Sequence, residues 1–344
     1  MRDKMLFGKK EYALCFGACV IWGIACLPVL EIGGLRAAAP LLLLVAGSLL
    51  YASELFAETP YRLLMVLLMA GSPWICHLTL RQDLKMLLFF AILPFLGFSM
   101  AGFERTGKWV YLLPALSGAV LPYLHPTFGF GILLCMIVYA LLIRRPAAVA
   151  TGAVGLIAGT PLLRGFLPYL HRGQPWREDV FLGQIQSRGY VFGQFFHSYT
   201  YRANQPGLGI GIWAGVLLLA YLKLTAASPA DVAQEEAGQG KEAGQQISSR
   251  HPRLLWITVV ILLWMSSIAF PWDALQKVAS PLYRLIGSLE SPYFFAWFAG
   301  FLLIPPAVRG IRGLCARRPD PVRTALLLFY AGGALVTMIY RLQG

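Results

Sequence analysis

Long apolar runs are the feature that most constrains what this chain can fold into. A helix that crosses a bilayer needs about 20 mostly apolar residues. Runs of about this length occur at eleven places: 12–30, 37–53, 62–80, 84–102, 109–124, 127–143, 147–164, 207–224, 254–270, 293–308 and 323–340. We therefore predict an all-α fold, a polytopic integral membrane helix bundle with about 11 transmembrane helices.

The composition agrees with this class and excludes others. Hydrophobic residues make up 58% of the chain, the mean hydropathy is +0.64 and 13% of residues are charged, whereas soluble domains carry about 25% charged residues. The net charge of +13 comes from basic residues scattered between the apolar runs. We therefore expect contacts with anionic lipid headgroups and no nucleic-acid partner.

The distribution of Lys and Arg predicts the orientation in a plasma membrane. Most basic residues fall on one side if the N-terminus is cytoplasmic, including Arg144, Arg145 and the cluster in 309–323. This is the positive-inside pattern of multi-pass proteins. Eleven crossings then place the C-terminus outside.

Two polar segments divide the chain. Residues 225–252 are rich in Ala, Gly and Gln, which predicts a disordered cytoplasmic linker. It separates an N-terminal bundle of about eight spans (1–224) from a C-terminal bundle of about three (253–344). Residues 165–206 form the largest outer loop, and its aromatic residues Trp176, Tyr190, Phe195, Tyr199 and Tyr201 are candidates for stacking on sugar rings.

An amphipathic stretch lies between the spans 254–270 and 293–308. After Pro271, the apolar residues from Leu275 to Leu289 recur at helical spacing, with charged and polar residues on the other side. This pattern predicts an interfacial helix over 272–289 that lies flat in the outer headgroup region.

Ionisable residues lie at span ends or in loops, so we expect any polar chemistry at an interface. Uncharged span centres disfavour an ion-coupled transporter. The candidate catalytic carboxylates are Glu178, Asp179 and Asp273, each a possible base for a sugar hydroxyl. The candidate substrate-binding residues are His125, Arg177, Arg188, His197, Trp272, Lys277, Arg284 and Glu290, of which the basic ones suit a lipid-linked phosphate.

Simpler interpretations of these residues stay open. Glu178 and Asp179 follow Arg177 and fit a solvated charge cluster. His125 precedes Pro126 and fits a turn, and aromatic residues near span ends fit an interfacial belt. No metal motif, nucleotide motif or nucleophile elbow is present, so we predict neither a metal nor a cofactor.

Several short motifs resemble the C-terminal membrane half of bacterial YfhO-like proteins. Phe270, Pro271 and Trp272 match a span that ends in Phe-Pro-Trp, and Pro292 and Phe295 match the opening of the next span. RQDLKMLLFFAILPF and the His-Pro of LPYLHPTFGFGILL also look like the family's middle spans, so the diffuse similarity covers roughly residues 80–310. The resemblance implies an architecture related to GT-C glycosyltransferases, which use polyprenyl-phosphate-linked sugars at the outer face.

The chain departs from the family pattern at two points. Phe294 stands where the family has Arg, and Glu31 is the only acidic residue in the first outer loop, where GT-C enzymes keep an acidic motif. The chain also has no room for the family's large outer domain, which implies a half-protein with a partner membrane protein or a non-catalytic relative.

Two functions therefore remain. The first is a GT-C-like protein of envelope glycan assembly that transfers, or assists the transfer of, a sugar from a polyprenyl-phosphate carrier. The alternative is a non-catalytic scaffold or lipid-handling subunit of an envelope polysaccharide complex.

Overall fold

The structure is a computed structural model that describes residues 35–142, 149, 152–153, 157, 189–196, 206–225, 252–280, 293–316, 322 and 324–333. These residues form helices and turns and contain no strand. The elements are α2 (Leu35–Leu55), α3 (Thr59–Ala70), α4 (Pro73–Leu80), α5 (Leu84–Thr106), η1 (Trp109–Leu112), η2 (Pro114–Val120), α6 (Leu121–Leu124), α7 (Pro126–Leu142), η3 (Phe192–Phe196), α10 (Ile210–Thr225), α12 (Pro252–Ser266), α13 (Trp272–Val278) and α15 (Tyr293–Ala316).

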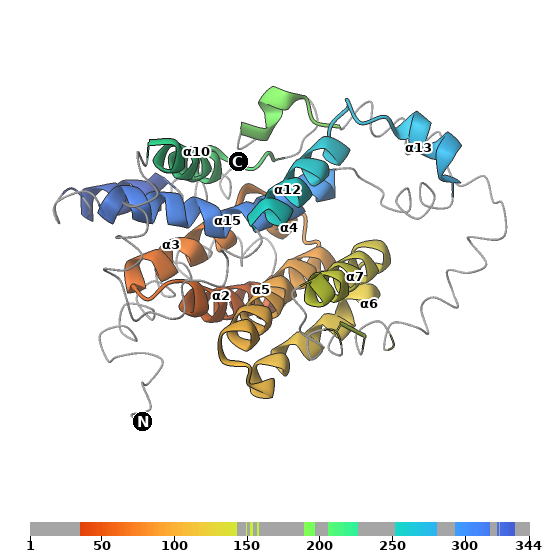
Figure 1. Ribbon diagram of the computed structural model, residues 1–344, viewed down its shortest axis with the longest axis horizontal. Helices are drawn as coiled ribbons and strands as arrows, with labels where there is room; N and C mark the ends of the chain where they lie inside the picture. The colour runs from red at the N-terminus through yellow and green to blue at the C-terminus, as the bar shows by residue number, and fades with distance from the viewer. Residues whose placement is uncertain are drawn as a thin grey trace.

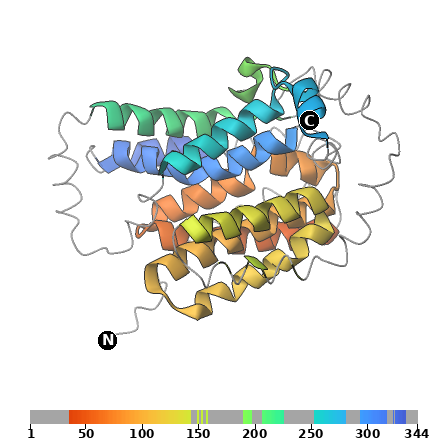
Figure 2. The ribbon, with the colours of Figure 1, turned by 45° about the vertical axis from the view of Figure 1, so that its right-hand side comes forward.

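The helices form two layers joined by α3. One layer holds α10, α12 and α15, and the other holds α2, α5, α6 and α7 (Figure 1). Helix α3 contacts both α2 and α15. The long helices lie roughly along one direction, with α13 at one end of the bundle (Figure 2), which is the arrangement expected of helices that cross a bilayer together.

Three described helices are long and apolar enough to cross a membrane: α2, α5 and α15. The pair α3 and α4 makes a fourth candidate that is bent by 45°. Shorter apolar helices cover 109–124, 210–222, 255–266 and 324–333. The all-helical, membrane-compatible class is therefore confirmed, whereas the count of eleven spans stays a prediction and the run 12–30 lies outside the described residues.

The predicted span over 62–80 is not one straight helix, because it breaks between α3 and α4, although the bent pair is still a candidate span. Gly71 ends α3 with its N–H on the Leu67 carbonyl, and Pro73 begins α4. The Ser72 hydroxyl donates to the Met69 carbonyl at 2.9 Å. Proline has no N–H to continue the ladder, so the chain bends and a side chain satisfies the freed carbonyl.

The run 109–124 is helical but is mostly a 3₁₀ helix, which periodicity did not predict. It comprises η1, η2 and α6, with Pro114 at the start of η2 and Pro122 in α6. Proline removes helical N–H groups, and short 3₁₀ turns accommodate such interruptions. The reversal expected at His125 is present, since α6 ends at Leu124 and α7 begins at Pro126.

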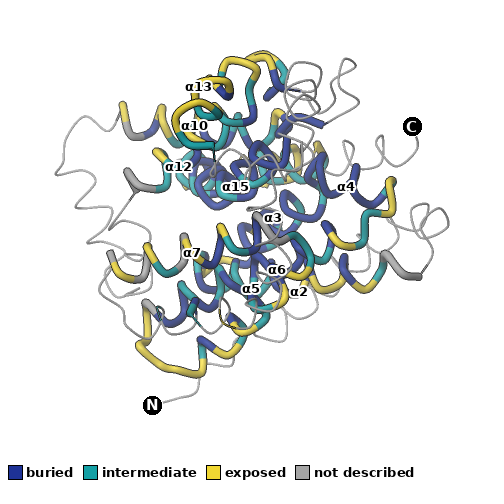
Figure 3. Tube along the Cα trace, turned by 90° about the vertical axis from the view of Figure 1, so that its right-hand side faces the viewer, coloured by how far each residue is buried: buried dark blue, intermediate teal, exposed yellow. Residues whose placement is uncertain are grey.

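Helix α15 extends beyond the predicted end of its span at residue 308 and reaches Ala316. It carries Pro305 and Pro306 inside and includes Arg309 and Arg312 in its last turns. The helix is long because its C-terminal part is still packed: Ile311 and Cys315 are fully buried. Figure 3 shows this helix as a largely buried element inside the bundle.

The relative directions of neighbouring helices match the predicted alternation of spans. Gly47 of α2 lies against the Phe95 ring of α5, and Gly97 of α5 lies against the Tyr51 ring of α2. The residue numbers of the contacting pairs increase along both helices, so α2 and α5 run parallel. In the predicted topology both helices run from the outer face to the cytoplasm.

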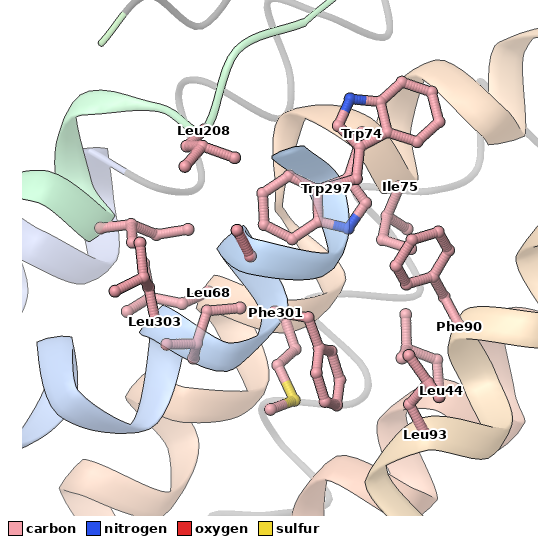
Figure 4. Close-up of a cluster of buried hydrophobic side chains, with 14 of the residues drawn as sticks. Leu44, Leu68, Trp74, Ile75, Phe90, Leu93, Leu208, Trp297, Phe301 and Leu303 are labelled. Atoms are coloured by element: carbon pink, nitrogen blue, oxygen red, sulfur yellow. The ribbon is translucent and has the colours of Figure 1, made fainter. Parts of the chain in front are cut away.

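The same test holds for α15 and its neighbours. Gly215 lies against Ala307, and Leu222 lies against Gly313, so α10 and α15 are parallel. Arg312 pairs with Glu58 at the start of α3, whereas His77 near the end of α4 lies against Trp297, so the α3–α4 pair runs antiparallel to α15. Figure 4 shows the buried packing around Trp74, Trp297 and Leu208 that joins these helices.

The outer surface of the bundle carries apolar stripes at helical spacing. In α10 the exposed stripe is Ile210, Leu217, Tyr221 and Leu224, and in α12 it is Ile257, Val260, Ile261 and Trp264. Such stripes are costly in water and match a hydrocarbon surrounding. In α10 this stripe lies opposite Gly215, Leu219 and Leu222, which pack on α15.

Candidate functional site

The two ends of the bundle differ in chemistry. One end, here called the ionic end, holds Glu54, Glu58, Arg62, Arg105 and Arg312. The other, here called the aromatic end, holds Phe89, His125, Phe128, Tyr190, Trp272, Phe294, Phe295 and Trp297. The predicted orientation assigns the ionic end to the cytoplasm and the aromatic end to the outer face.

The ionic end is held together by internal pairs. Arg105 lies 2.8 Å from Glu54, whose side chain is 2% exposed, and Arg312 lies 3.1 Å from Glu58. Arg62 donates from Nε to the Phe56 carbonyl and from Nη2 to the Ala57 carbonyl, each at 2.7 Å. These contacts satisfy carbonyls after the C-terminus of α2 and fasten α2, α3, α5 and α15. We therefore assign this end a structural role.

At the aromatic end, Trp272 anchors α13 to the bundle. Its buried ring lies 4.5 Å from the Phe270 ring and 6.2 Å from the Phe295 ring, centroid to centroid. Phe295 in turn packs 5.2 Å from Phe128 of α7. The next residues of α13, Asp273 and Lys277, are exposed. One end of this short helix is fixed while its charged side chains remain accessible.

His125 lies on the α6–α7 turn in a cage of rings. Its centroid is 5.1 Å from Phe128, 5.7 Å from Phe294 and 6.3 Å from Phe89. Its buried Nδ1 atom makes no hydrogen bond. Burial lowers the pKa of His125 to about 4, opposed by the nearby Asp83 carboxylate. The imidazole is therefore neutral near pH 7 and does not supply the positive charge a phosphate needs.

Tyr190, a described residue of the large loop, is hydrogen-bonded to the end of α12 and to Pro206 before α10. Its N–H donates to the Ser266 carbonyl at 3.0 Å, and its carbonyl accepts from Ile268 N–H at 3.2 Å. Its hydroxyl donates to the Pro206 carbonyl at 2.6 Å, which also accepts from Trp297 Nε1 at 3.3 Å. Burial raises the pKa of Tyr190. Tyr190 and Phe195 are buried, so the prediction that they stack on sugar rings is wrong.

The candidate residues divide between described and undescribed parts of the chain. The described ones, His125, Trp272, Asp273 and Lys277, all lie toward the aromatic end. The remaining candidates lie outside the described residues: Arg177, Glu178, Asp179, Arg188, His197, Arg284 and Glu290. Of the interfacial helix predicted over 272–289, the structure shows α13, which ends at Val278, and residues 281–289 lie outside the described residues.

Sequence reasoning missed one carboxylate at this end, Asp83. It caps α5 by accepting a hydrogen bond from Met86 N–H at 3.1 Å. An Asp directly before an apolar run is the usual signal of such a cap. Within the described ranges, no group of three or more His, Cys, Asp or Glu side chains is placed to hold a metal ion.

Comparisons with protein-family models, with curated proteins and with solved structures find no match for this chain.

Proposed function

We propose that this chain is a GT-C-like membrane protein of bacterial envelope glycan assembly. It holds a polyprenyl-phosphate-linked sugar at its outer face and transfers, or assists the transfer of, that sugar. The observation that carries the proposal is α13, which is anchored by the buried Trp272 while Asp273 and Lys277 remain exposed.

The physical chemistry of α13 suits the headgroup of a charged lipid. Asp273 and Lys277 are four residues apart, so they share one face of the helix. Val278 is 88% exposed, and such an apolar residue gains from contact with the acyl boundary. A vertical, inserted pose would cost about 2.5–3.5 kcal/mol for each charge at the bilayer centre. A position in the headgroup region satisfies both kinds of side chain.

We assign Lys277, which the structure describes, to the lipid phosphate. Arg284, seven residues later and outside the described residues, is its predicted partner. The test is retention of native polyprenyl lipid by the purified protein, measured by mass spectrometry. We expect Lys277→Gln combined with Arg284→Gln to lose the lipid. Lys223→Gln, on the opposite side of the predicted topology, keeps it, and equal retention in both variants contradicts the proposal.

Catalysis itself requires a carboxylate at the outer face. Glu178 with Asp179, and then Asp273, are the proposed bases for the acceptor hydroxyl. Replacing Glu178 and Asp179 by their amides is expected to abolish glycan transfer while expression is unchanged. Unchanged product in this double variant, and in Asp273→Asn, would assign the chain to the alternative function.

That alternative is a non-catalytic, lipid-handling subunit that works with a partner membrane protein. One observation favours it: His125 is a neutral, caged imidazole rather than an accessible acid or base. Co-purification identifies the bound protein and lipid, and the carboxylate variants above then distinguish the two functions, because only a catalytic chain needs its own outer carboxylates for transfer.

A further inference from the structure

The short helix η3 presents an apolar side chain that the described part of the bundle leaves largely exposed. Phe192 is 77% exposed, and its neighbour Val191 is also exposed. The Phe192 ring lies 5.5 Å from Phe196, which lies 4.9 Å from Trp213 of α10. The three rings are therefore in consecutive contact, from Trp213 on α10 to the exposed Phe192 of η3.

The position of η3 is fixed by hydrogen bonds at both of its ends. Tyr190 is paired with the end of α12 through Ser266 and Ile268. The Phe195 carbonyl accepts from Leu208 N–H at 3.1 Å and from Trp213 Nε1 at 2.9 Å. These contacts hold the backbone of η3, so rotating this helix to bring the Phe192 side inward would break them.

The apolar surface of η3 continues the surface stripe of α10. Ile210, the first residue of α10, is 73% exposed and begins the stripe that runs on to Leu217, Tyr221 and Leu224. On the other side, Ile268 follows the exposed stripe of α12. Aromatic side chains concentrate where membrane-spanning helices meet the headgroups.

We propose that η3 is a second membrane-anchoring element, with Phe192 inserted into the outer leaflet of the bilayer. The occupant of this surface is lipid, because the surface lies at the end of two apolar helices and beside their exposed apolar stripes, which match a hydrocarbon surrounding. The element is independent of α13 and of any lipid-linked sugar, so its failure would leave the proposed function standing.

The primary test maps depth with spin labels in the full chain reconstituted into phospholipid vesicles. Cysteine is introduced singly in place of Phe192, Leu217 or Arg81 in a background without the native cysteines. Leu217 of the α10 stripe serves as the hydrocarbon reference, and the exposed Arg81 before α5 serves as the aqueous reference. We expect the label at position 192 to be accessible to oxygen and at least fivefold less accessible to a soluble nickel chelate than the label at 81.

A second measurement uses the unmodified chain and so does not depend on cysteine replacement. Vesicles that carry a diazirine on the phospholipid acyl chain are irradiated, and adducts are mapped by mass spectrometry. We expect adducts on Val191 or Phe192 and none on 81–83. Nickel accessibility at 192 equal to that at 81 overturns the proposal. So does a position 192 that neither oxygen nor the lipid probe reaches, which would mean a second copy or another protein covers it.

Discussion

Glu54 shows how a single residue can decide the pairing of two helices. Its carboxylate is enclosed at the end of α2 and meets Arg105, which lies 51 positions later at the same end of α5. A buried charge without its partner is strongly destabilising, whereas neutral replacement of both partners is not. The pair therefore favours the parallel register of α2 and α5 over shifted alternatives.

The first prediction concerns this pair. Arg105→Met is expected to lower stability by about 3 kcal/mol, the lower end of the range for breaking a buried pair, because the Arg105 side chain is 34% exposed. Lys85→Met, at an exposed position near the other end of α5, is the matched control and is expected to change little. The double variant Glu54→Gln with Arg105→Met should recover part of the loss. Thermal unfolding in detergent measures all three, and equal melting of Arg105→Met and the control would contradict this role.

His125 makes a prediction about pH. Its pKa falls from 6.5 in the unfolded chain to about 4 in the fold, so the unfolded state binds more protons between these values. Stability is therefore full above pH 6.5 and declines as the pH falls toward 4. We expect the melting temperature of the protein to drop across this window, and to drop less for His125→Phe, which fits the same cage of rings without titrating. An identical pH dependence in the two proteins would contradict the account.

At the scale of elements, the contact between α10 and α15 depends on missing side chains. A Cβ on Gly215 would sit 2.6 Å from the Ala307 carbonyl oxygen, and a Cβ on Gly310 would meet the Gly215 carbonyl. Gly211 and Gly215 have the Gly-x-x-x-Gly spacing that is typical of closely packed membrane helices. Only Gly215 is at the tight crossing, because a Cβ on Gly211 would make an ordinary 3.7 Å contact with Leu68.

Two glycine-to-alanine changes should therefore affect the stability of the protein differently. Gly215→Ala forces α10 and α15 apart and is expected to lower the melting temperature by several degrees. Gly131→Ala in α7, where no atom lies within 4 Å of the added Cβ, should be neutral or stabilise by up to about 1 kcal/mol through helix propensity. The comparison uses the same purified protein and detergent. A Gly215→Ala variant at least as stable as Gly131→Ala would contradict the close contact of α10 with α15 at Gly215.

The elements also show what the sequence can and cannot predict. Apolar runs located α2, α5 and α15, since length and hydropathy alone decide which segments enter a bilayer. They did not reveal the break at Pro73 or the 3₁₀ winding of 109–124, because hydropathy does not depend on hydrogen-bond pattern. Nor did they reveal that Tyr190 is buried by Pro206 and Trp297, contacts that arise only from tertiary packing.

At the scale of the whole molecule, the predicted membrane topology agrees with the relative directions of the helices and with the different chemistry of the two ends. The alternation of spans predicted from Lys and Arg agrees with the parallel α2–α5 and α10–α15 pairs and with the antiparallel α3–α15 pair. In this topology the paired arginines lie at one end of the bundle, and His125 and α13 lie at the other. These relative directions are observed, whereas the number of spans and the side of the membrane on which each end lies stay predictions.

That prediction is the central claim, and the side on which residues 225–252 lie tests it most directly. This segment follows α10, whose parallel partner α15 carries Arg312 of the ionic end. A reporter pair, one active only in the cytoplasm and one only outside it, is fused in turn within 225–252 of the expressed protein. The account predicts activity of the cytoplasmic reporter alone, with the aromatic end outside. Activity of the outer reporter from the same site would mean that the protein has the opposite orientation, which would contradict the account.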